Sequence, residues 1–116
     1  MSGCINKIML LGYLGADPQI REVSSGKVAS FSLATSDSWT DKEGERQEKT
    51  QWHRVIAYNG LAEIAERFLK KRSRVYLEGQ LQTRTWTDGD GTDRLLTMVV
   101  LNKFRSELVL LDQKNA

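Results

Sequence analysis

The sequence is poor in the residue types that build crosslinks, metal centres and catalytic sites, since it has one cysteine, one histidine and one proline. The single cysteine, Cys4, cannot form an internal disulfide, which is typical of a protein in a reducing compartment. Cys4 and His53 together supply too few ligands for a zinc site and too few partners for a nucleophilic triad. Neither a metal, a cofactor nor a catalytic activity is therefore expected.

Long apolar runs and a strong charge of one sign are also absent. No run of about 18 apolar residues occurs, so no membrane-spanning segment is expected. The N-terminus has neither a long apolar stretch nor an Arg-rich presequence, which favours a cytoplasmic location. The net charge is +2, from 17 Lys and Arg against 15 Asp and Glu. That excess is too small to indicate nucleic-acid binding, so the placement of the charges matters more than their sum.

Two ligand-binding patterns are incomplete or missing. Neither a phosphate-cradling Walker sequence nor a GxGxxG sequence is present. Residues 88–93 resemble the start of a calcium loop, but the sixth position is Asp93 instead of Gly and the twelfth is Val99 instead of Glu. We interpret this segment as a solvated turn.

What the sequence does contain is strand-like alternation of polar residues with β-branched and aromatic ones. Five long strands are predicted, at residues 5–14, 27–35, 50–58, 74–86 and 95–103. The first is mostly apolar and is expected to be partly buried on both faces. Shorter strands are predicted at residues 20–23 and within 104–111, the latter free to pair with a neighbouring subunit. Residues 36–49 are expected to form an exposed, mobile hairpin with Trp39 at its base.

One helix is predicted between the third and fourth strands, with Asn59 as its N-cap and residues 70–72 at its end. Its apolar residues follow helical spacing and form one stripe: Leu61, Ile64, Ala65, Phe68 and Leu69. The order of elements predicts an all-β protein with the five-stranded, Greek-key OB-fold. Residues 1–111 are expected to form a single domain, with residues 112–116 frayed. The fold alone does not give the function.

Aromatic residues in polar surroundings are the sharpest functional signal. In the third strand Trp52, Arg54 and Tyr58 share a face, because side chains alternate. Trp86 likewise falls beside Arg84. Aromatic rings hold single-stranded nucleic acid without reading its sequence, because every base has a π-face. The predicted stacking residues are Trp39, Trp52, Tyr58 and Trp86; burial in the core is the alternative.

Four cations are predicted to contact phosphates: Lys7, Arg54, Arg72 and Arg84. Strand alternation favours Arg54 and Arg84, which lie beside tryptophans. The alternative for each is a solvated charge without a role, and Arg72 also suits a helix C-terminus. His53 faces away from Trp52, which favours packing or a subunit interface.

The chain resembles the bacterial-type single-stranded DNA-binding protein family. The resemblance covers about residues 5–103 and rests on long segments in family order. These segments are residues 6–18 (NKIMLLGYLGADP), residues 33–36 (LATS) followed by Trp39, residues 50–55 (TQWHRV), residues 75–81 (VYLEGQL) and residues 83–88 (TRTWTD).

The resemblance implies a homotetramer wrapped by single-stranded DNA, which it protects during replication, recombination and repair in the cytoplasm, associated with the bacterial nucleoid. It implies stacking by the four aromatic residues named above, and subunit contacts at His53 and Ile5. Tyr13 departs from the Asn common in the family. The sequence ends without the linker and acidic tip through which family members recruit replication and repair enzymes, so those partners are not expected of this chain.

Three alternatives remain open. A primosomal or RNA-binding OB protein would share the fold. A small nuclease would need acidic metal ligands or a His pair, which the sequence does not supply. A structural oligomerisation module would not need exposed tryptophans.

Overall fold

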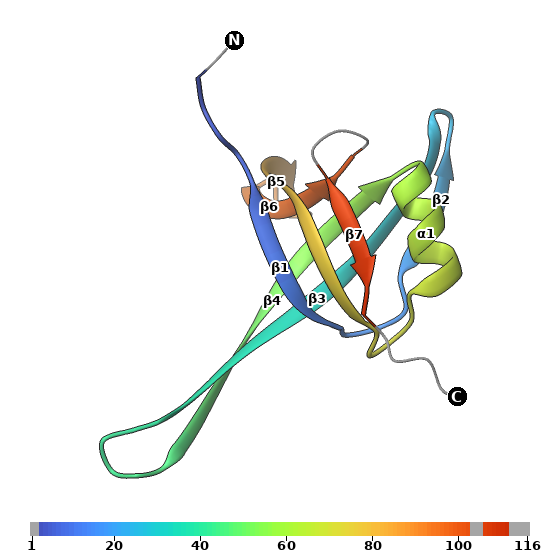
Figure 1. Cartoon of the computed structure of the whole chain (residues 1–116). Helices are drawn as coiled ribbons and strands as arrows, with labels where there is room; N and C mark the ends of the chain where they lie inside the picture. The colour runs from blue at the N-terminus through green and yellow to red at the C-terminus, as the bar shows by residue number, and fades with distance from the viewer. Residues whose placement is uncertain (1–2, 103–105, 112–116) are drawn as a thin grey trace, which may run out of the picture.

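The computed structural model describes residues 3–102 and 106–111 and contains seven strands and one helix in that part of the chain (Figure 1). The strands are β1 (Ile8–Leu14), β2 (Gln19–Val23), β3 (Gly26–Thr40), β4 (Arg46–Tyr58), β5 (Arg74–Thr87), β6 (Asp93–Leu101) and β7 (Glu107–Leu110). The helix, α1 (Gly60–Phe68), lies between β4 and β5. The five long predicted strands correspond to β1, β3, β4, β5 and β6, and the helix falls where it was predicted.

The strand pairings run in a closed circuit from β1 to β3, β4, β6, β5 and back to β1. All of these pairings are antiparallel except that between β4 and β6. The predicted OB-fold is confirmed. Strand β5 is shared along its length, because its first half pairs with β1 and its second half pairs with β6.

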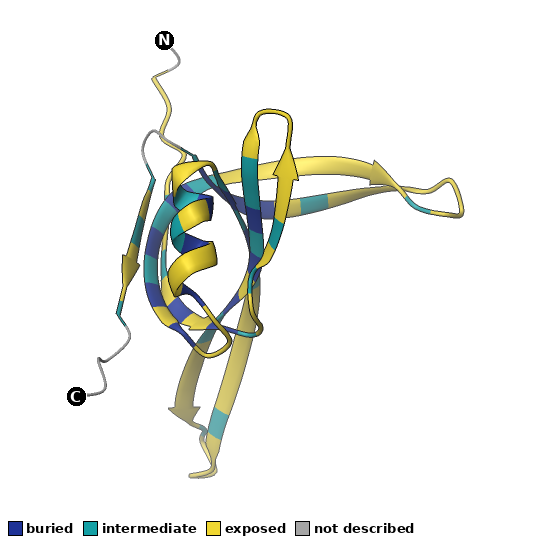
Figure 2. Cartoon of the chain, turned by 90° about the vertical axis from the view of Figure 1, so that its right-hand side faces the viewer, coloured by how far each residue is buried: buried dark blue, intermediate teal, exposed yellow. Residues whose placement is uncertain are grey.

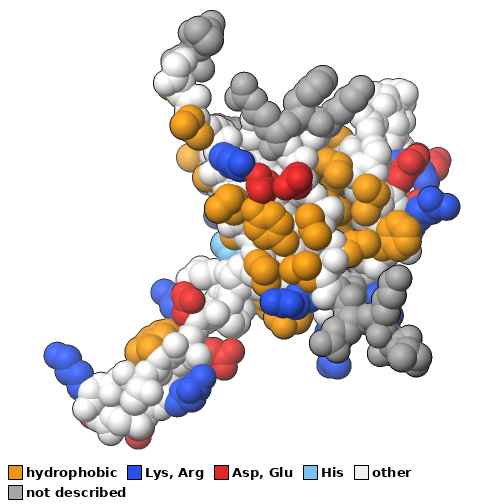
Figure 3. Space-filling model, in the orientation of Figure 1, with side chains coloured by type: hydrophobic (Ala, Val, Ile, Leu, Met, Phe, Trp, Pro, Cys, Tyr) orange, Lys and Arg blue, Asp and Glu red, His pale blue; other side chains and the backbone are white. Residues whose placement is uncertain are grey.

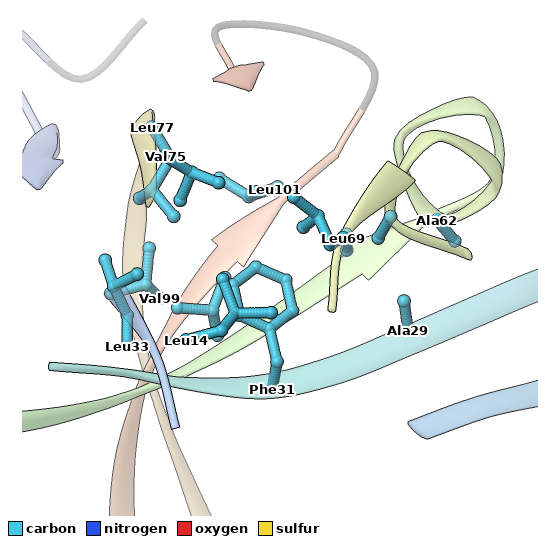
Figure 4. Packing of buried hydrophobic residues seen from close by; sticks show 13 residues of the cluster. Leu14, Ala29, Phe31, Leu33, Ala62, Leu69, Val75, Leu77, Val99 and Leu101 are labelled. Carbon is cyan, nitrogen blue, oxygen red and sulfur yellow. The ribbon is translucent and has the colours of Figure 1, made fainter. Parts of the chain in front are cut away.

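Alternating side chains fill the interior of this circuit. Phe31 and Leu33 on β3 are buried, together with Val55 on β4 and Leu77 on β5. Figure 4 shows side chains from β3, β5 and β6 converging on the same interior as Leu69. Fully burying a Leu, Val or Phe stabilises the fold by roughly 1.5–3 kcal/mol. The core therefore needs no metal or disulfide to hold the strands in place.

Strand β1 differs from its prediction, because only one of its faces is buried. Leu14 is buried, whereas Met9, Leu11 and Tyr13 are exposed. A strand with apolar residues on both faces predicts burial on both faces. In the folded subunit the second apolar face has no covering layer from the described residues of its own chain.

The hairpin between the second and third long strands is more regular than predicted. The β3–β4 ladder continues to the pair Thr40↔Arg46, and Trp39 lies opposite Gln47 near the tip instead of at the base. Asp41 closes the turn, because its Oδ1 accepts the backbone N–H of Glu43 at 3.0 Å and of Glu45 at 2.9 Å. Backbone pairing keeps this polar segment extended as a ribbon. Figures 1 and 2 show it projecting from the body, with most of its residues exposed.

Helix α1 packs on β3 and β4 through small residues. Ala62 and Ala65 are fully buried, whereas Phe68, predicted to face the core, is 55% exposed. The helix ends at Phe68, and the next residue, Leu69, has an extended backbone. The Leu69 side chain therefore turns inward and is buried, in place of the Phe68 side chain. The prediction for Asn59 was half right: it occupies the N-cap position, but its side chain makes no capping hydrogen bond.

Strand β7 pairs through one edge with β5 of the same chain, from Val75↔Leu110 to Glu78↔Glu107. Its pairing with a neighbouring subunit stays a prediction. The end of the fifth predicted strand, at Lys103, and the segment 112–116, which was predicted to be frayed, lie outside the described residues. Within the described ranges, no helix is both long enough and apolar enough to cross a membrane.

Candidate nucleic-acid interface

The strand registers place three of the four predicted stacking residues on the outer side of the sheet. Ile56 on β4 and Gln80 on β5 both pair with Val100 on β6, so these three residues share the face opposite the core. Every second residue along β4 and β5 lies on that same face. We call it the aromatic face and define it by Trp52, Arg54, Tyr58, Arg84 and Trp86.

Trp52 lies over the backbone of Gly15. A Cβ atom on Gly15 would stand only 2.6 Å from Cζ3 of the indole, so any larger residue at this position would force the indole to shift. The indole is nevertheless 61% exposed. Trp52 and Arg54 line an open hollow of about 370 Å³ together with Gly15 and Asp17. A flat ring held against the backbone beside a cation can stack on a base while the cation meets its phosphate.

Tyr58 and Arg84 are joined directly across the aromatic face. Arg84 Nη2 donates a hydrogen bond of 2.7 Å to the Tyr58 hydroxyl, and its Nε donates one of 2.8 Å to Gln82 Oε1. Both acceptors are neutral, so the guanidinium keeps its full charge while its orientation is fixed. This arrangement places a ring and an uncompensated cation side by side.

Trp86 and Trp39 lie on the two projecting ribbons. Trp86, on the β5–β6 ribbon, is 50% exposed and pairs with Arg94. Arg94 Nε binds Asp88 Oδ2 at 2.7 Å, and this ion pair lowers the pKa of the Asp88 carboxyl. Trp39 is 47% exposed, but strand alternation puts it on the face of its ribbon opposite Trp52. The structure therefore brings Trp52, Tyr58 and Trp86 to one face and presents Trp39 from the other side of the ribbon.

The four predicted phosphate-contacting cations occupy different surroundings. Within the described residues, the Arg54 and Arg72 guanidinium groups have no side-chain partner, and both residues are exposed. The loop that carries Arg72 is tied to β1, since the Arg72 N–H donates to the Leu14 carbonyl at 3.0 Å. Lys7 differs from these two, because its Nζ pairs with the Glu78 carboxylate at 2.7 Å. Contact of Lys7 with phosphate stays a prediction that its position does not favour.

A second exposed surface is the outward side of the β1–β5–β7 sheet. Register pairs put Leu11, Tyr76 and Val109 on this side, with Met9 beside Glu78 and Tyr13 beside Arg74. We call this the β1 sheet face. Figure 3 shows its apolar side chains clustered toward the viewer, with charged groups at the upper edge.

The two residues predicted at subunit contacts lie near different parts of the chain. Ile5 is 92% exposed in the N-terminal segment beside the β1 sheet face. His53 is half-buried, and its Nε2 lies 2.9 Å from Thr35 Oγ1 on the neighbouring strand. The packing role predicted for His53 is present, whereas the subunit contacts stay predictions.

The sequence did not predict two residues that hold parts of the site in place, Asn6 by bonding to the backbone of β5 and Gly15 by leaving space for a ring. Asn6 donates from Nδ2 to the Leu81 carbonyl and accepts the Leu81 N–H at Oδ1, at 2.8 and 2.9 Å. This pair of bonds fastens the N-terminal segment to β5. Gly15 is the second such residue, because its missing side chain makes room for Trp52. No local pattern signals either contact, because the partners are 75 and 37 positions away.

Three carboxylates gather at the tip of the β3–β4 ribbon. Oxygen atoms of Asp41, Glu43 and Glu45 lie within 4.8 Å of one another. Asp41 uses both of its oxygens in the turn, since Oδ2 also accepts from Gln47 Nε2 at 3.0 Å. The backbone hydrogen bond from Glu45 is the main cause that lowers the pKa of Asp41. These hydrogen bonds show that Asp41 stabilises the turn, and they explain why the three carboxylates lie close together.

An OB-fold with exposed tryptophans and uncompensated arginines on its outer surface defines a nucleic-acid-binding module. Residues 5–106 match the family model described as the single-strand binding protein family. The chain belongs to this family.

Curated relatives and a solved structure resemble the chain along nearly its whole length. It is 47% identical over 119 residues to a single-stranded DNA-binding protein of Rickettsia typhi, covering 100% of this chain and 78% of that protein. It is 49% identical over 115 residues to one of Rhizobium meliloti, covering 97% of this chain and 66% of that protein. A solved structure, the Plasmodium falciparum SSB complex with ssDNA, superposes with a TM-score of 0.86 at 36% identity, covering 97% of this chain and 99% of that chain.

Proposed function

We propose that this chain binds single-stranded DNA without regard to sequence, by stacking bases on Trp39, Trp52, Tyr58 and Trp86. Arg54, Arg84 and Arg72 neutralise phosphates, with Lys7 a more distant contributor. The observation that carries this proposal is the aromatic face, where three exposed or half-exposed rings stand beside cations that have no carboxylate partner. Stacking supplies sequence-independent affinity, and the arginines supply its electrostatic part.

Membership of the family makes the chain a single-stranded DNA-binding protein and not an enzyme. Binding of this kind protects the strand and prevents re-pairing during replication, recombination and repair. An RNA-binding OB protein would share the stacking rings, so competition between DNA and RNA strands separates that alternative. The expected site is the bacterial cytoplasm, in association with the nucleoid.

We also propose that the chain assembles as a homotetramer through the β1 sheet face. An apolar cluster of Met9, Leu11, Tyr76 and Val109 is left uncovered in the subunit, although strands normally bury such a face. Residues 8–12 of β1 also pair with β5 along one edge, while their other edge has no strand partner among the described residues. Assembly would cover the apolar side chains and would add the sites of several subunits to one DNA strand.

Intrinsic tryptophan fluorescence tests the proposed binding mode. We expect quenching when poly(dT) is titrated into the protein, saturating at a fixed number of nucleotides, with no quenching by duplex DNA. The affinity should fall with salt at a log–log slope of roughly −0.7 per neutralised phosphate. Binding without quenching would contradict stacking, and absence of binding would remove the proposed function.

A further inference from the structure

Asn59 joins β4 to α1 in an unusual backbone conformation. Its φ is 54° and its ψ is −118°, a region that turns usually fill with glycine. Neighbours hold this conformation from both sides. The Asn59 N–H donates to the Lys27 carbonyl at 2.9 Å, and the Asn59 carbonyl accepts the Glu63 N–H at 2.9 Å. The fold therefore fixes Asn59 in this state.

This ψ value brings the next backbone nitrogen close to the Asn59 side chain. About Cα, the Cβ atom stands one third of a turn from the backbone nitrogen, so a ψ of −118° nearly eclipses Cβ with the nitrogen of Gly60. The Asn59 amide lies against Gly26, where a Cβ atom would stand 2.0 Å from Asn59 Oδ1, and it makes no capping hydrogen bond. Rotation about the Cα–Cβ bond that moves the amide away from Gly26 brings the amide carbon Cγ against the Gly60 nitrogen. Most residues cannot hold this arrangement, because a negative ψ of this size is rare for non-glycine residues with positive φ.

The Gly60 nitrogen is accessible and has no competing bond. Gly60 is the first residue of α1, where backbone N–H groups have no acceptor within the helix. In the described part of the chain no other acceptor binds its N–H. Both residues are exposed, and a Cβ atom on Gly60 would have no heavy atom within 4 Å other than those of its chain neighbours and of the backbone of α1. Water and base can therefore reach the reacting atoms.

We propose that Asn59 is a site of spontaneous modification, at which the folded chain deamidates itself. The Gly60 nitrogen attacks Asn59 Cγ, a new N–Cγ bond forms, and the Cγ–Nδ2 bond breaks. Ammonia leaves with the proton that the Gly60 nitrogen gives up. Water then opens the resulting cyclic imide at one of its two carbonyl carbons. The products are aspartate or isoaspartate at position 59, and the balance is one water consumed and one ammonia released.

Each product changes the start of α1. Aspartate places a carboxylate at the N-cap, where the helix dipole and the free N–H groups stabilise a negative charge. Isoaspartate inserts one extra main-chain carbon after Tyr58 and disturbs the bonds to Lys27 and Glu63. Both products add a negative charge at the residue that directly follows Tyr58 of the aromatic face. A weakening of single-stranded DNA binding follows from that charge, and this consequence rests on the function proposed above.

Ageing of the purified chain tests the modification itself. The protein is incubated at mildly alkaline pH, folded or in denaturant, and its peptides are examined by mass spectrometry. We expect Asn59 to convert to the acid, faster in the folded chain than in denaturant. Asn6 and Asn102 are internal controls and should stay amides, since each precedes a lysine and Asn6 is bonded at both side-chain atoms to Leu81.

Two variants refine this test. Gly60→Ala should slow the conversion in the folded chain, because the methyl group crowds the attacking nitrogen, and Asn59→Gly should abolish it. An Asn59 that keeps its amide in the folded protein while converting in denaturant would overturn the proposal.

The effect on binding is measured separately. Asn59→Asp should bind poly(dT) several-fold more weakly than Asn59→Gly, which suits the same φ and carries no charge. Equal affinities would overturn the effect on DNA. Failure of the unmodified chain to bind poly(dT) would instead remove the proposed function. The mass measurement would still test the modification, because it does not depend on DNA binding.

Discussion

The hydrogen bond between Arg84 and Tyr58 makes it possible to separate the ring of Tyr58 from its hydroxyl. Tyr58→Phe keeps the ring and removes the acceptor for Arg84, whereas Tyr58→Ala removes both. If the ring stacks on a base, Tyr58→Ala should cost about as much as is known for proteins of this class, roughly 1–3 kcal/mol per base. Tyr58→Phe should cost much less. Affinities for poly(dT) measured at one fixed salt concentration check this order, and equal losses in both variants would contradict stacking by Tyr58.

Glu78 and Tyr76, which lie on the β1 sheet face, shift each other's pKa. Hydrogen bonds from Lys7 and then from Tyr76 lower the pKa of Glu78, and the bond to Glu78 is the main cause that raises the pKa of Tyr76 from 10.0 to about 12. A lowered carboxyl pKa contributes stability that is lost as the pH falls through its folded value. A raised tyrosine pKa contributes stability that is complete below pH 10.0 and is lost as the pH rises through about 12.

The ultraviolet absorbance of tyrosinate checks this prediction. We expect one tyrosine of the folded protein to ionise near pH 12, and Glu78→Gln should move that ionisation back toward 10.0. Tyr76→Phe identifies the signal, because it should remove that step alone. A step that stays near pH 12 in Glu78→Gln would show that Glu78 is not its cause.

At the residue scale, the sequence predicts sites well where strand alternation decides them. It placed Trp52 and Arg54 on one face and His53 on the other, and the burial agrees, because Trp52 and Arg54 are exposed and His53 is half-buried. It failed for Phe68, because the helical spacing does not reveal that α1 ends there and that Leu69 turns inward. It could not foresee the Lys7–Glu78 pair, which joins segments distant in the sequence.

At the element scale, the β3–β4 ribbon can be tested apart from the core. Replacing residues 38–48 by Asn-Gly would connect the register pair Asp37↔Lys49 through a two-residue turn. The removed part contributes no core residue, so we expect an unchanged thermal midpoint. Affinity for poly(dT) should fall, since Trp39 is lost. Trp39→Ala in the full-length ribbon is the matched control, and a fall in the midpoint of the shortened chain would show that the ribbon supports the fold.

The order of the elements was predictable, but their lengths were not. Five long strands and one helix follow from alternation and helical spacing, both of which are local properties. The ends of the β3–β4 ladder are set by backbone pairing across the ribbon. Polar residues are compatible with this pairing, but their pattern in the sequence does not predict it. The partner of β7 was also beyond reach, because a short apolar strand fits an edge of its own sheet and an edge of another subunit equally well.

At the scale of the whole molecule, the proposed assembly depends on the apolar side of β1. Leu11→Glu places a charge in the centre of the β1 sheet face without touching the core, because Leu11 is 46% exposed. We expect native mass spectrometry to show loss of the tetramer at low concentration and retained folding by circular dichroism. His53→Ala should weaken the assembly less directly, by releasing Thr35.

A matched control is Leu95→Glu, which carries the same change on the β5–β6 ribbon, where Leu95 is 75% exposed. It should leave the assembly intact. Dissociation in both leucine variants would indicate a general effect of added charge, and an intact tetramer in Leu11→Glu would place the interface elsewhere.

The position of the aromatic face on the outside of the strand circuit has a topological consequence. A polymer laid on Trp52, Tyr58 and Trp86 never passes through a closed opening of the subunit, because these side chains point away from the interior. A strand that has no free end, such as a circle or a gap bounded by duplex on both sides, can therefore be loaded laterally. Release needs no end either, so an advancing enzyme can displace the protein from the middle of a strand.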